Sequence, residues 1–243
     1  MTVTEEICDL CSGTGWVLES SEGRKRAHPC ICRAASLARA RLEAAGIPER
    51  YRDCTLENFS DNTLSLTNAR RAARDFVDAY PAPEAGLLLV GPAGRGKTHL
   101  ACAILSELVT TKGATGLYVD FSDLLMKIQT SFRPDADASK ESVLTPYADA
   151  EILVLDELGA SKPHAWVLDV LYSLLNARYN RKKITIATSN FEDELDGAGE
   201  REKLEDRIGY RLRSRLYEMC LLVPLRGSDF RKDVLGTRIR SRF

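Results

Sequence analysis

The sequence lacks any apolar run of the roughly 18–20 residues that a helix needs to cross a bilayer. Its first residues, MTVTEEICDLCSGTG, carry acidic side chains where a secretory signal has basic ones, and they include no apolar core segment. We therefore expect no membrane role and a cytoplasmic location. Thiols stay reduced in that compartment, so clustered cysteines are more often metal ligands there than disulfides.

Histidine is also scarce, with three residues in 243, and nothing in the sequence resembles a nucleophilic triad or an internal repeat. The length suits one large domain, or a moderate domain with an appendage. A hydrophobic content of 44% and a charged content of 28% are typical of a globular protein. The net charge of −1 conceals a basic end, because residues 201–243 hold twelve Lys and Arg against six Asp and Glu. That end is suited to meeting phosphates.

Short apolar segments alternate with helical patterns through most of the chain. The apolar segments show no alternation of inward and outward side chains, so they predict a parallel sheet covered by helices on both faces, an α/β fold. We expect a module with a linking helix in residues 1–45 and a larger α/β domain in residues 46–243. The expected strands are 86–90, 116–121, 150–157 and 183–190, and the expected helices are 33–46, 64–79, 97–111, 122–131 and 165–180.

The segment GPAGRGKT fits the phosphate-loop pattern G-x-x-x-x-G-K-[ST], and it lies between a predicted strand and a predicted helix. Glycines let such a loop curl round phosphates, while backbone N–H groups and the helix N-terminus supply positive potential. We expect Lys97 to reach the β- and γ-phosphates of ATP and the Thr98 hydroxyl to bind Mg²⁺. We interpret the His99 side chain itself as structural. The residues assigned to ATP binding are Gly91, Pro92, Ala93, Gly94, Arg95, Gly96, Lys97, Thr98 and His99.

Two further strand ends carry polar side chains beside this loop. ILVLDE brings adjacent carboxylates out of the C-terminal end of a buried strand, where open parallel sheets bind ligands. Asp156 is then expected to hold Mg²⁺ and Glu157 to polarise the attacking water. TIATSN ends the next strand, and we place Asn190 near the γ-phosphate or that water. The alternative is that Asn190 starts a turn.

Four of the seven cysteines lie in the first 32 residues, a module too small to fold on apolar burial alone. Cys8, Cys11, Cys30 and Cys32 provide enough ligands for tetrahedral Zn²⁺, with His28 as an alternative fourth ligand. Gly13 and Gly15 allow a tight turn beneath the metal, and CDLCSGTG resembles the knuckle of DnaJ-type zinc domains. A redox CxxC pair is disfavoured, since SGTG does not continue as a helix. The other cysteines, expected to be small core residues, are Cys54, Cys102 and Cys220.

Several segments, taken in their order along the chain, resemble the DnaC/DnaI-type AAA+ ATPases. They are GIPERYRDCTLENF, the phosphate-loop segment, GLYVDFSDLL, ILVLDELG, TIATSN and RLRSRLYEMCLLVPLRGSDFRKD. These proteins load the replicative helicase and are related to the IstB transposition ATPases. The resemblance covers about residues 46–233. It implies an AAA+ fold with a reduced lid, hydrolysis of ATP to ADP and phosphate, and a homo-oligomer in the ATP state. It also implies binding of single-stranded DNA and of a hexameric replicative helicase.

The same resemblance gives roles to the basic C-terminal segment. It implies that Arg215, or as second choice Arg211, enters the ATP site of a neighbouring subunit and stabilises charge on the γ-phosphate. A solvated helix face is the alternative for these arginines. Arg231 matches the position that senses nucleotide in its own subunit. The terminal RIRSRF, residues 238–243, is interpreted as a solvated tail, with a DNA-phosphate contact as the alternative.

The leading hypothesis is an ATP-dependent helicase loader whose N-terminal module holds the helicase. The main alternative is an IstB-like transposition ATPase that binds DNA and recruits a transposase, and a third is a non-hydrolysing adaptor with a nucleotide fold. A single-strand channel needs basic side chains and aromatics on which bases stack. The candidates, which equally suit a plain surface excursion, are Lys127, Phe132, Arg133 and Lys140.

Overall fold

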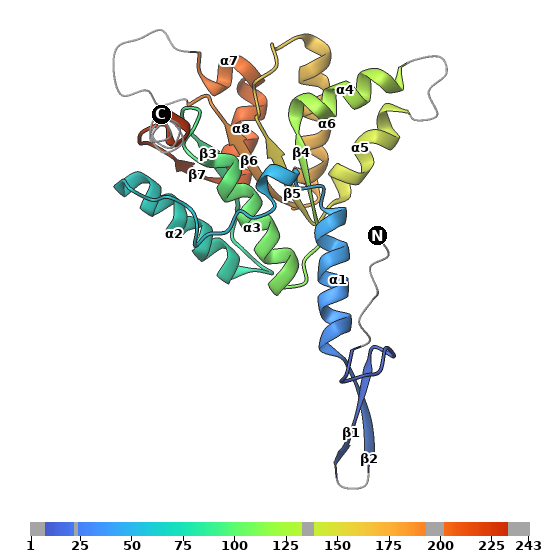
Figure 1. Cartoon of the computed structure of the whole chain (residues 1–243). Helices are drawn as coiled ribbons and strands as arrows, with labels where there is room; N and C mark the ends of the chain where they lie inside the picture. Colours follow the sequence, from blue (N-terminus) through green and yellow to red (C-terminus); the bar gives the residue numbers. More distant parts are fainter. Residues whose placement is uncertain (1–7, 22–23, 133–138, 193–201, 233–243) are drawn as a thin grey trace, which may run out of the picture.

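The structure is a computed structural model that describes residues 8–21, 24–132, 139–192 and 202–232. A body of helices and strands holds most of the chain, and one long helix, α1 (Ile31–Ala44), projects from it (Figure 1). At the far end of α1 lies an antiparallel hairpin of β1 (Trp16–Ser21) and β2 (Arg24–Pro29). None of the helices within the described ranges is long and apolar enough to cross a membrane.

The body contains a five-stranded sheet in the order β4-β5-β6-β3-β7, and every neighbouring pair is parallel. This confirms the predicted parallel sheet. Three of the strands are buried almost throughout, which is why their sequences show no alternation. The strands are β3 (Gly86–Val90), β4 (Gly116–Asp120), β5 (Ile152–Asp156), β6 (Ile184–Ser189) and β7 (Cys220–Pro224).

Helices cover both faces of the sheet, so alternate residues of one strand enter different cores. Leu87 and Leu89 pack on the side of α2 (Leu64–Ala79) and α3 (Lys97–Thr111). Leu88 and Val90 pack on the opposite side. The helices of that second side are α4 (Phe121–Ser131), α5 (Lys140–Asp149), α6 (Ala165–Asn180), α7 (Leu204–Ile208) and α8 (Tyr210–Met219).

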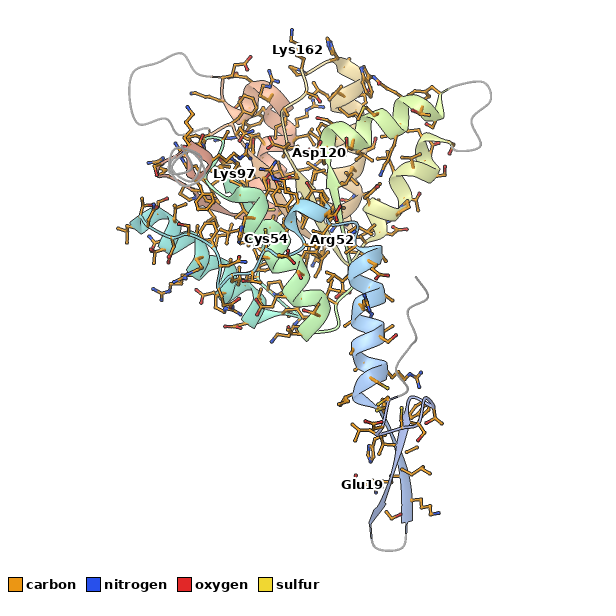
Figure 2. All side chains as sticks on the ribbon, viewed as in Figure 1. Glu19, Arg52, Cys54, Lys97, Asp120 and Lys162 are labelled. Carbon is orange, nitrogen blue, oxygen red and sulfur yellow. The ribbon has the colours of Figure 1, made fainter. Side chains whose placement is uncertain are left out.

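Helix α1 joins the body only at its C-terminal end. None of its own residues is buried, whereas Ala45, which follows it, is completely buried. Arg41 Nη1 donates to the carbonyl of Gly113 at 2.6 Å, and the backbone N–H of Tyr118 donates to the carbonyl of Ala45 at 2.7 Å. Figure 2 shows the consequence, since Glu19 on the hairpin lies far from Lys97 in the body.

The structure differs from the sequence-based expectations in two segments. Residues 140–149 form the helix α5, and residues 220–224 form an edge strand; neither element was predicted. The predicted helix 33–46 begins earlier, at Ile31, and ends at Ala44. Arg133 and residues 233–243, which include the predicted tail 238–243, lie outside the described residues.

Candidate functional site

The phosphate loop joins the C-terminal end of β3 to the start of α3, as its motif predicts. Gly94 and Gly96 have left-handed φ angles of 80° and 86°. A Cβ atom at Gly94 would lie 2.1 Å from Asp229 Oδ1, and one at Gly96 would lie 2.6 Å from Phe59 Cε2. Both the backbone angle and the close packing therefore require glycine at these two positions.

Lys97, at the first position of α3, is only 5% exposed. Its Nζ atom donates to the carbonyl oxygens of Gly91 at 2.8 Å and Pro92 at 3.0 Å, and to Asn190 Oδ1 at 2.7 Å. Burial lowers the pKa of this ammonium to about 8, although the nearby carboxylates of Glu157 and Asp156 act to raise it. Phosphate oxygens would offer it the anionic partners that a buried cation favours.

Asp156 ends β5 and is buried with three hydroxyl groups around its carboxylate. Its Oδ1 atom accepts from Thr98 Oγ1 at 3.0 Å and from Thr188 Oγ1 at 2.5 Å, and its Oδ2 atom accepts from the Tyr118 hydroxyl at 2.7 Å. Burial and the Asp156 charge raise the pKa of Tyr118, which keeps its proton available for donation. A fixed carboxylate beside a threonine hydroxyl fits the oxygen ligands that Mg²⁺ prefers.

Glu157 follows directly and has a left-handed φ of 56°, which is uncommon for a residue with a side chain. Its backbone N–H donates to Thr188 Oγ1 at 3.1 Å, and its Oε2 atom accepts from Asn190 Nδ2 at 2.5 Å. Burial, and then the neighbouring Asp156, raise the pKa of the Glu157 carboxyl. The turn thus separates the two carboxylates, leaving Asp156 among hydroxyls and turning Glu157 towards Asn190.

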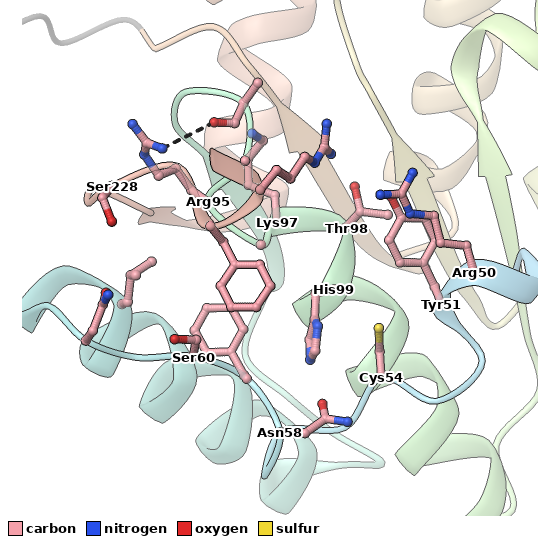
Figure 3. Close-up of a pocket in the computed structure, with 18 of the residues that line it drawn as sticks. Arg50, Tyr51, Cys54, Asn58, Ser60, Arg95, Lys97, Thr98, His99 and Ser228 are labelled. Carbon is pink, nitrogen blue, oxygen red and sulfur yellow. Dashed lines mark hydrogen bonds between the residues drawn. The ribbon is translucent and has the colours of Figure 1, made fainter. Parts of the chain in front are cut away.

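A cavity of about 420 Å³ opens beside the loop and is lined by Lys97, Glu157 and Asn190. Figure 3 shows Arg50 and Tyr51 entering it from one side and Arg95 and Ser228 from the other. Its apolar and aromatic walls suit a flat ring next to the phosphate loop. No site role was predicted for these walls, although most of them lie in segments that resemble the DnaC/DnaI-type ATPases. The additional lining residues include Arg50, Tyr51, Asn58, Phe59, Leu66, Ser228 and Phe230.

Two other predicted residues lie at this cavity. His99 Nε2 lies 2.9 Å from the carbonyl of Thr55, and its ring meets Phe59 edge-on at a centroid distance of 5.5 Å. These contacts hold the segment before α2 against α3, in line with the structural interpretation of that histidine. Arg231 also lines the cavity, and its backbone N–H donates to Asp229 Oδ1 at 3.0 Å.

The two candidate finger arginines lie on α8 and are not among the residues that line this cavity. The Arg215 guanidinium lies over the rings of Tyr172, at 4.8 Å, and Tyr179, at 5.7 Å. Its Nη1 atom is buried and has no hydrogen-bond partner among the described residues. Arg211, by contrast, is exposed. The structure therefore brings together all the predicted ATP-site residues except these two.

The four N-terminal cysteines converge although up to 24 residues separate them in sequence. Their Sγ atoms all lie within 4.8 Å of one another, with Cys8 and Cys30 at 3.7 Å and Cys11 and Cys32 at 3.4 Å. Four thiolates bonded tetrahedrally to zinc at about 2.3 Å lie roughly 3.8 Å apart, so the donor set and its spacing fit Zn²⁺. The CxxC pair, Cys8 and Cys11, and the CxC pair, Cys30 and Cys32, together form the cluster.

The residues around the cluster bear on its possible ligands. His28 lies on β2 opposite Val17, with Nε2 3.3 Å from Glu19 Oε2, and is not part of the cluster. The pairing of β1 with β2 holds it along the hairpin, so the prediction of a site made of four cysteines is favoured. Gly13 and Gly15 have left-handed φ angles of 82° and 73°, as the predicted tight turn requires.

The expected DNA-contacting residues are spread around α4 and α5. Lys127 Nζ donates to the Tyr147 hydroxyl at 3.1 Å, Phe132 is 63% exposed, and Lys140 begins α5. The DNA role of these residues stays a prediction.

Comparison with known proteins agrees with this geometry. The sequence pattern of the family described as IstB-like ATP binding protein matches residues 32–234. The replicative helicase loader DnaC of Escherichia coli K12 is 27% identical over 199 residues, which cover 81% of this chain and 80% of DnaC. A putative insertion sequence ATP-binding protein of Sinorhizobium fredii NGR234 is 33% identical over 77% of this chain and 61% of its own length. A crystal structure of the DnaC helicase loader superimposes with a TM-score of 0.65 and 29% identity, covering 74% of this chain and all of that one.

Proposed function

The chain belongs to the IstB-like ATP binding protein family, and we propose that it is an ATP-dependent loader of the replicative DNA helicase. Homology to DnaC over four fifths of both sequences supports this role. In this proposal the N-terminal module holds a hexameric helicase, and an oligomer of the AAA+ domain binds single-stranded DNA in the cytoplasm. ATP hydrolysis times the release of the loader.

The observation that carries the proposal is the separation of the cysteine cluster from the ATP site. Helix α1 holds the hairpin away from the body (Figure 1). Large apolar side chains are exposed on the hairpin and α1, in a module whose own core is very small. A protein-interaction surface is the use that best accounts for such exposure. These side chains are Leu10, Trp16, Leu18, Ile31 and Leu37, which are between 46% and 72% exposed.

We assign ATP hydrolysis to the cavity beside the phosphate loop. Thr98 and Asp156 would hold Mg²⁺, which when bound neutralises phosphate charge and orients the oxygens. Lys97 would exchange its carbonyl partners for phosphate oxygens. Glu157, held by Asn190, is then placed to accept a proton from the attacking water. The products are ADP and phosphate.

Completion of the site by a second subunit is the reason to expect an active oligomer. Arg215, with Arg211 as second choice, would enter a neighbour's site and stabilise the γ-phosphate as charge develops. Arg231 would contact the nucleotide of its own subunit. Hydrolysis would then report on assembly.

Zinc would serve the module as a structural staple. Four thiolates and one Zn²⁺ carry a formal charge of −2, and Lys25, Arg26 and Arg33 lie in the same module to offset it. The energy of metal binding to such a module is folding energy, so the metal would shape the interaction surface and take no part in hydrolysis.

An IstB-like transposition ATPase is the second candidate function. It is supported by the family description and by the similarity to the Sinorhizobium insertion sequence protein. Such a protein would bind duplex DNA and recruit a transposase. The cysteine cluster gives no particular support to that role.

Pull-down with the full chain separates the two functions. With ATP present, the wild-type chain is expected to capture the purified hexameric helicase of its host. The Cys11→Ser variant, which breaks the cluster, should capture little. Cys220→Ser, which lies in the core of the body and lines neither the cluster nor the ATP cavity, should capture as much as wild type. Capture of a transposase without the helicase would overturn the loader proposal.

A further inference from the structure

Tyr118 lies on β4, an edge strand, with Asp156 on the adjacent strand β5. Its register partner is Val154, and Asp156 follows two residues later on the same face of the sheet. That diagonal position is within reach of a tyrosine side chain but not of a shorter one. The strand pairing therefore aims the Tyr118 hydroxyl at the Asp156 carboxylate.

The contact fixes one oxygen of that carboxylate. Thr98 and Thr188 both donate to Oδ1, and the Tyr118 hydroxyl donates to Oδ2 at 2.7 Å. Within the described part of the chain, no other side-chain hydrogen bond reaches Oδ2. Without the tyrosine hydroxyl, the carboxylate would be held at one oxygen and free to turn about it.

The backbone of the same residue meets the end of α1. An edge strand presents N–H groups that have no partner strand, and such edges need cover. The Tyr118 N–H donates to the carbonyl of Ala45 at 2.7 Å, and Ala45 is completely buried. Arg41 adds a second tie to the loop before β4 through the carbonyl of Gly113. The backbone of Tyr118 thus contacts Ala45 at the end of α1, and its side chain contacts Asp156 in the proposed ATP site.

We infer that Tyr118 is a positioning residue that sets the orientation of Asp156 and ties it to the end of α1. The inference rests on the proposed ATP site, in which Asp156 holds Mg²⁺. Groups that orient a metal-binding side chain typically account for about 10–100-fold in metal affinity. A displacement of α1, such as one caused by a partner pulling on the hairpin, would reach the metal ligand through Tyr118.

Magnesium-dependent nucleotide binding tests the positioning role directly. A fluorescent, non-hydrolysable ATP analogue is titrated with Mg²⁺ on the full chain, and the midpoint for Mg²⁺-dependent tightening is measured. Tyr118→Phe keeps the ring and loses the hydroxyl, so its midpoint should rise about ten-fold. Its binding of the analogue without Mg²⁺ should equal that of wild type, which also shows that the variant folds.

The matched control is Tyr80→Phe. Tyr80 also donates its hydroxyl to a carboxylate, that of Glu151, which lies just before β5 at the opposite end of the strand from Asp156. Its Mg²⁺ midpoint should remain at the wild-type value. Equal midpoints for Tyr118→Phe and wild type would overturn the positioning role. A wild-type chain whose analogue binding ignores Mg²⁺ would overturn the metal assignment of Asp156 as well.

Hydrogen exchange tests the tie to α1. In wild type, the analogue with Mg²⁺ should slow exchange of the Tyr118 amide, whose hydrogen bond to Ala45 would be held more firmly. In Tyr118→Phe this slowing should be lost, while amides of the phosphate loop still respond. If the exchange rate of the Tyr118 amide in wild type is the same with and without Mg²⁺ and the analogue, the coupling to α1 is contradicted.

Discussion

Asn190 joins the ends of two neighbouring strands to the phosphate loop, donating to Glu157 Oε2 at 2.5 Å and accepting from Lys97 Nζ at 2.7 Å. One amide thus holds both the proposed base and the proposed phosphate-binding cation. The amide can serve both because it has a donor and an acceptor end. A substitution of Glu157 or Lys97 should therefore alter the position of the other side chain through Asn190.

Glu157→Gln should abolish hydrolysis while leaving ATP bound. A glutamine keeps the size of the side chain but cannot accept the proton of the attacking water, a contribution of about 10²–10⁴-fold in rate. Single-turnover hydrolysis and equilibrium ATP binding measure the two effects separately. The matched control is Glu141→Gln, at an exposed position of α5, which should hydrolyse ATP like wild type. Undiminished hydrolysis in Glu157→Gln would remove the water-activating role from this residue.

Mixing two inactive variants tests whether Arg215 acts across a subunit boundary. Arg215→Ala keeps an intact ATP site and lacks the finger, whereas Glu157→Gln keeps the finger and lacks the base. Each alone should hydrolyse ATP poorly, yet both should bind it. A mixture should recover part of the activity, because some interfaces then combine an intact site with an intact finger.

Two outcomes would revise that assignment. If Arg215→Ala fails to bind ATP, the residue acts in its own subunit. If Arg215→Ala is active and Arg211→Ala gives the mixing effect instead, the exposed arginine is the finger. The packing of Arg215 against Tyr172 and Tyr179 makes a modest loss of stability an expected side effect of Arg215→Ala.

The cysteine cluster should hold one zinc ion per chain. Elemental analysis of the purified full chain is expected to find zinc in wild type and in His28→Ala, because His28 lies outside the cluster and beside Glu19. Cys11→Ser should lose most of it. Zinc retained in Cys11→Ser and absent from His28→Ala would contradict the four-cysteine site. Removal of the metal should unfold the hairpin and leave ATP binding intact, because the body has its own core.

Arg178 should be a major contributor to stability at the sheet end away from the ATP site. It is completely buried, and its guanidinium donates to the carbonyls of Tyr147, Ala150 and Ile184 and to Thr185 Oγ1. Arg178→Leu leaves these buried acceptors without a donor and should lower the free energy of unfolding by about 3 kcal/mol or more.

Chemical denaturation measures that loss, with Arg181→Ala as the control. Arg181 pairs with Asp149 where both side chains are about half exposed, so its removal should lower the free energy of unfolding by less than about 1 kcal/mol. Losses of equal size in the two variants would show that the buried hydrogen bonds of Arg178 contribute little.

The features that could be predicted are those that depend on short, contiguous sequence motifs. The phosphate loop, the DE pair and Asn190 each follow an apolar strand, and parallel strands necessarily bring their C-terminal ends to one edge. The turn at Gly13 and Gly15 was predictable for the same reason, since the glycines sit inside the motif.

The parts that were missed depend on contacts between distant segments. Helix α5 contains Pro146, which normally opposes a helix, and it packs only once α4 and α6 are beside it. The aromatic wall at Tyr51 and Phe59 becomes a site only when α3 lies next to it. The Tyr118 contact with Asp156 requires the strand order β4-β5 and its register, which no local pattern specifies.

Helicase loading onto circular single-stranded DNA tests the central claim most directly, because a closed hexamer cannot thread onto a circle without free ends. The helicase bound to isolated circles is measured with ATP and each form of the chain. The wild-type chain should strongly raise the amount of helicase bound to the circles. Cys11→Ser should lose the contact with the helicase, and Lys97→Ala should lose ATP binding. Neither variant should load the helicase. If the amount of helicase bound to the circles is the same with and without the wild-type chain, the proposal that the chain is a loader is contradicted.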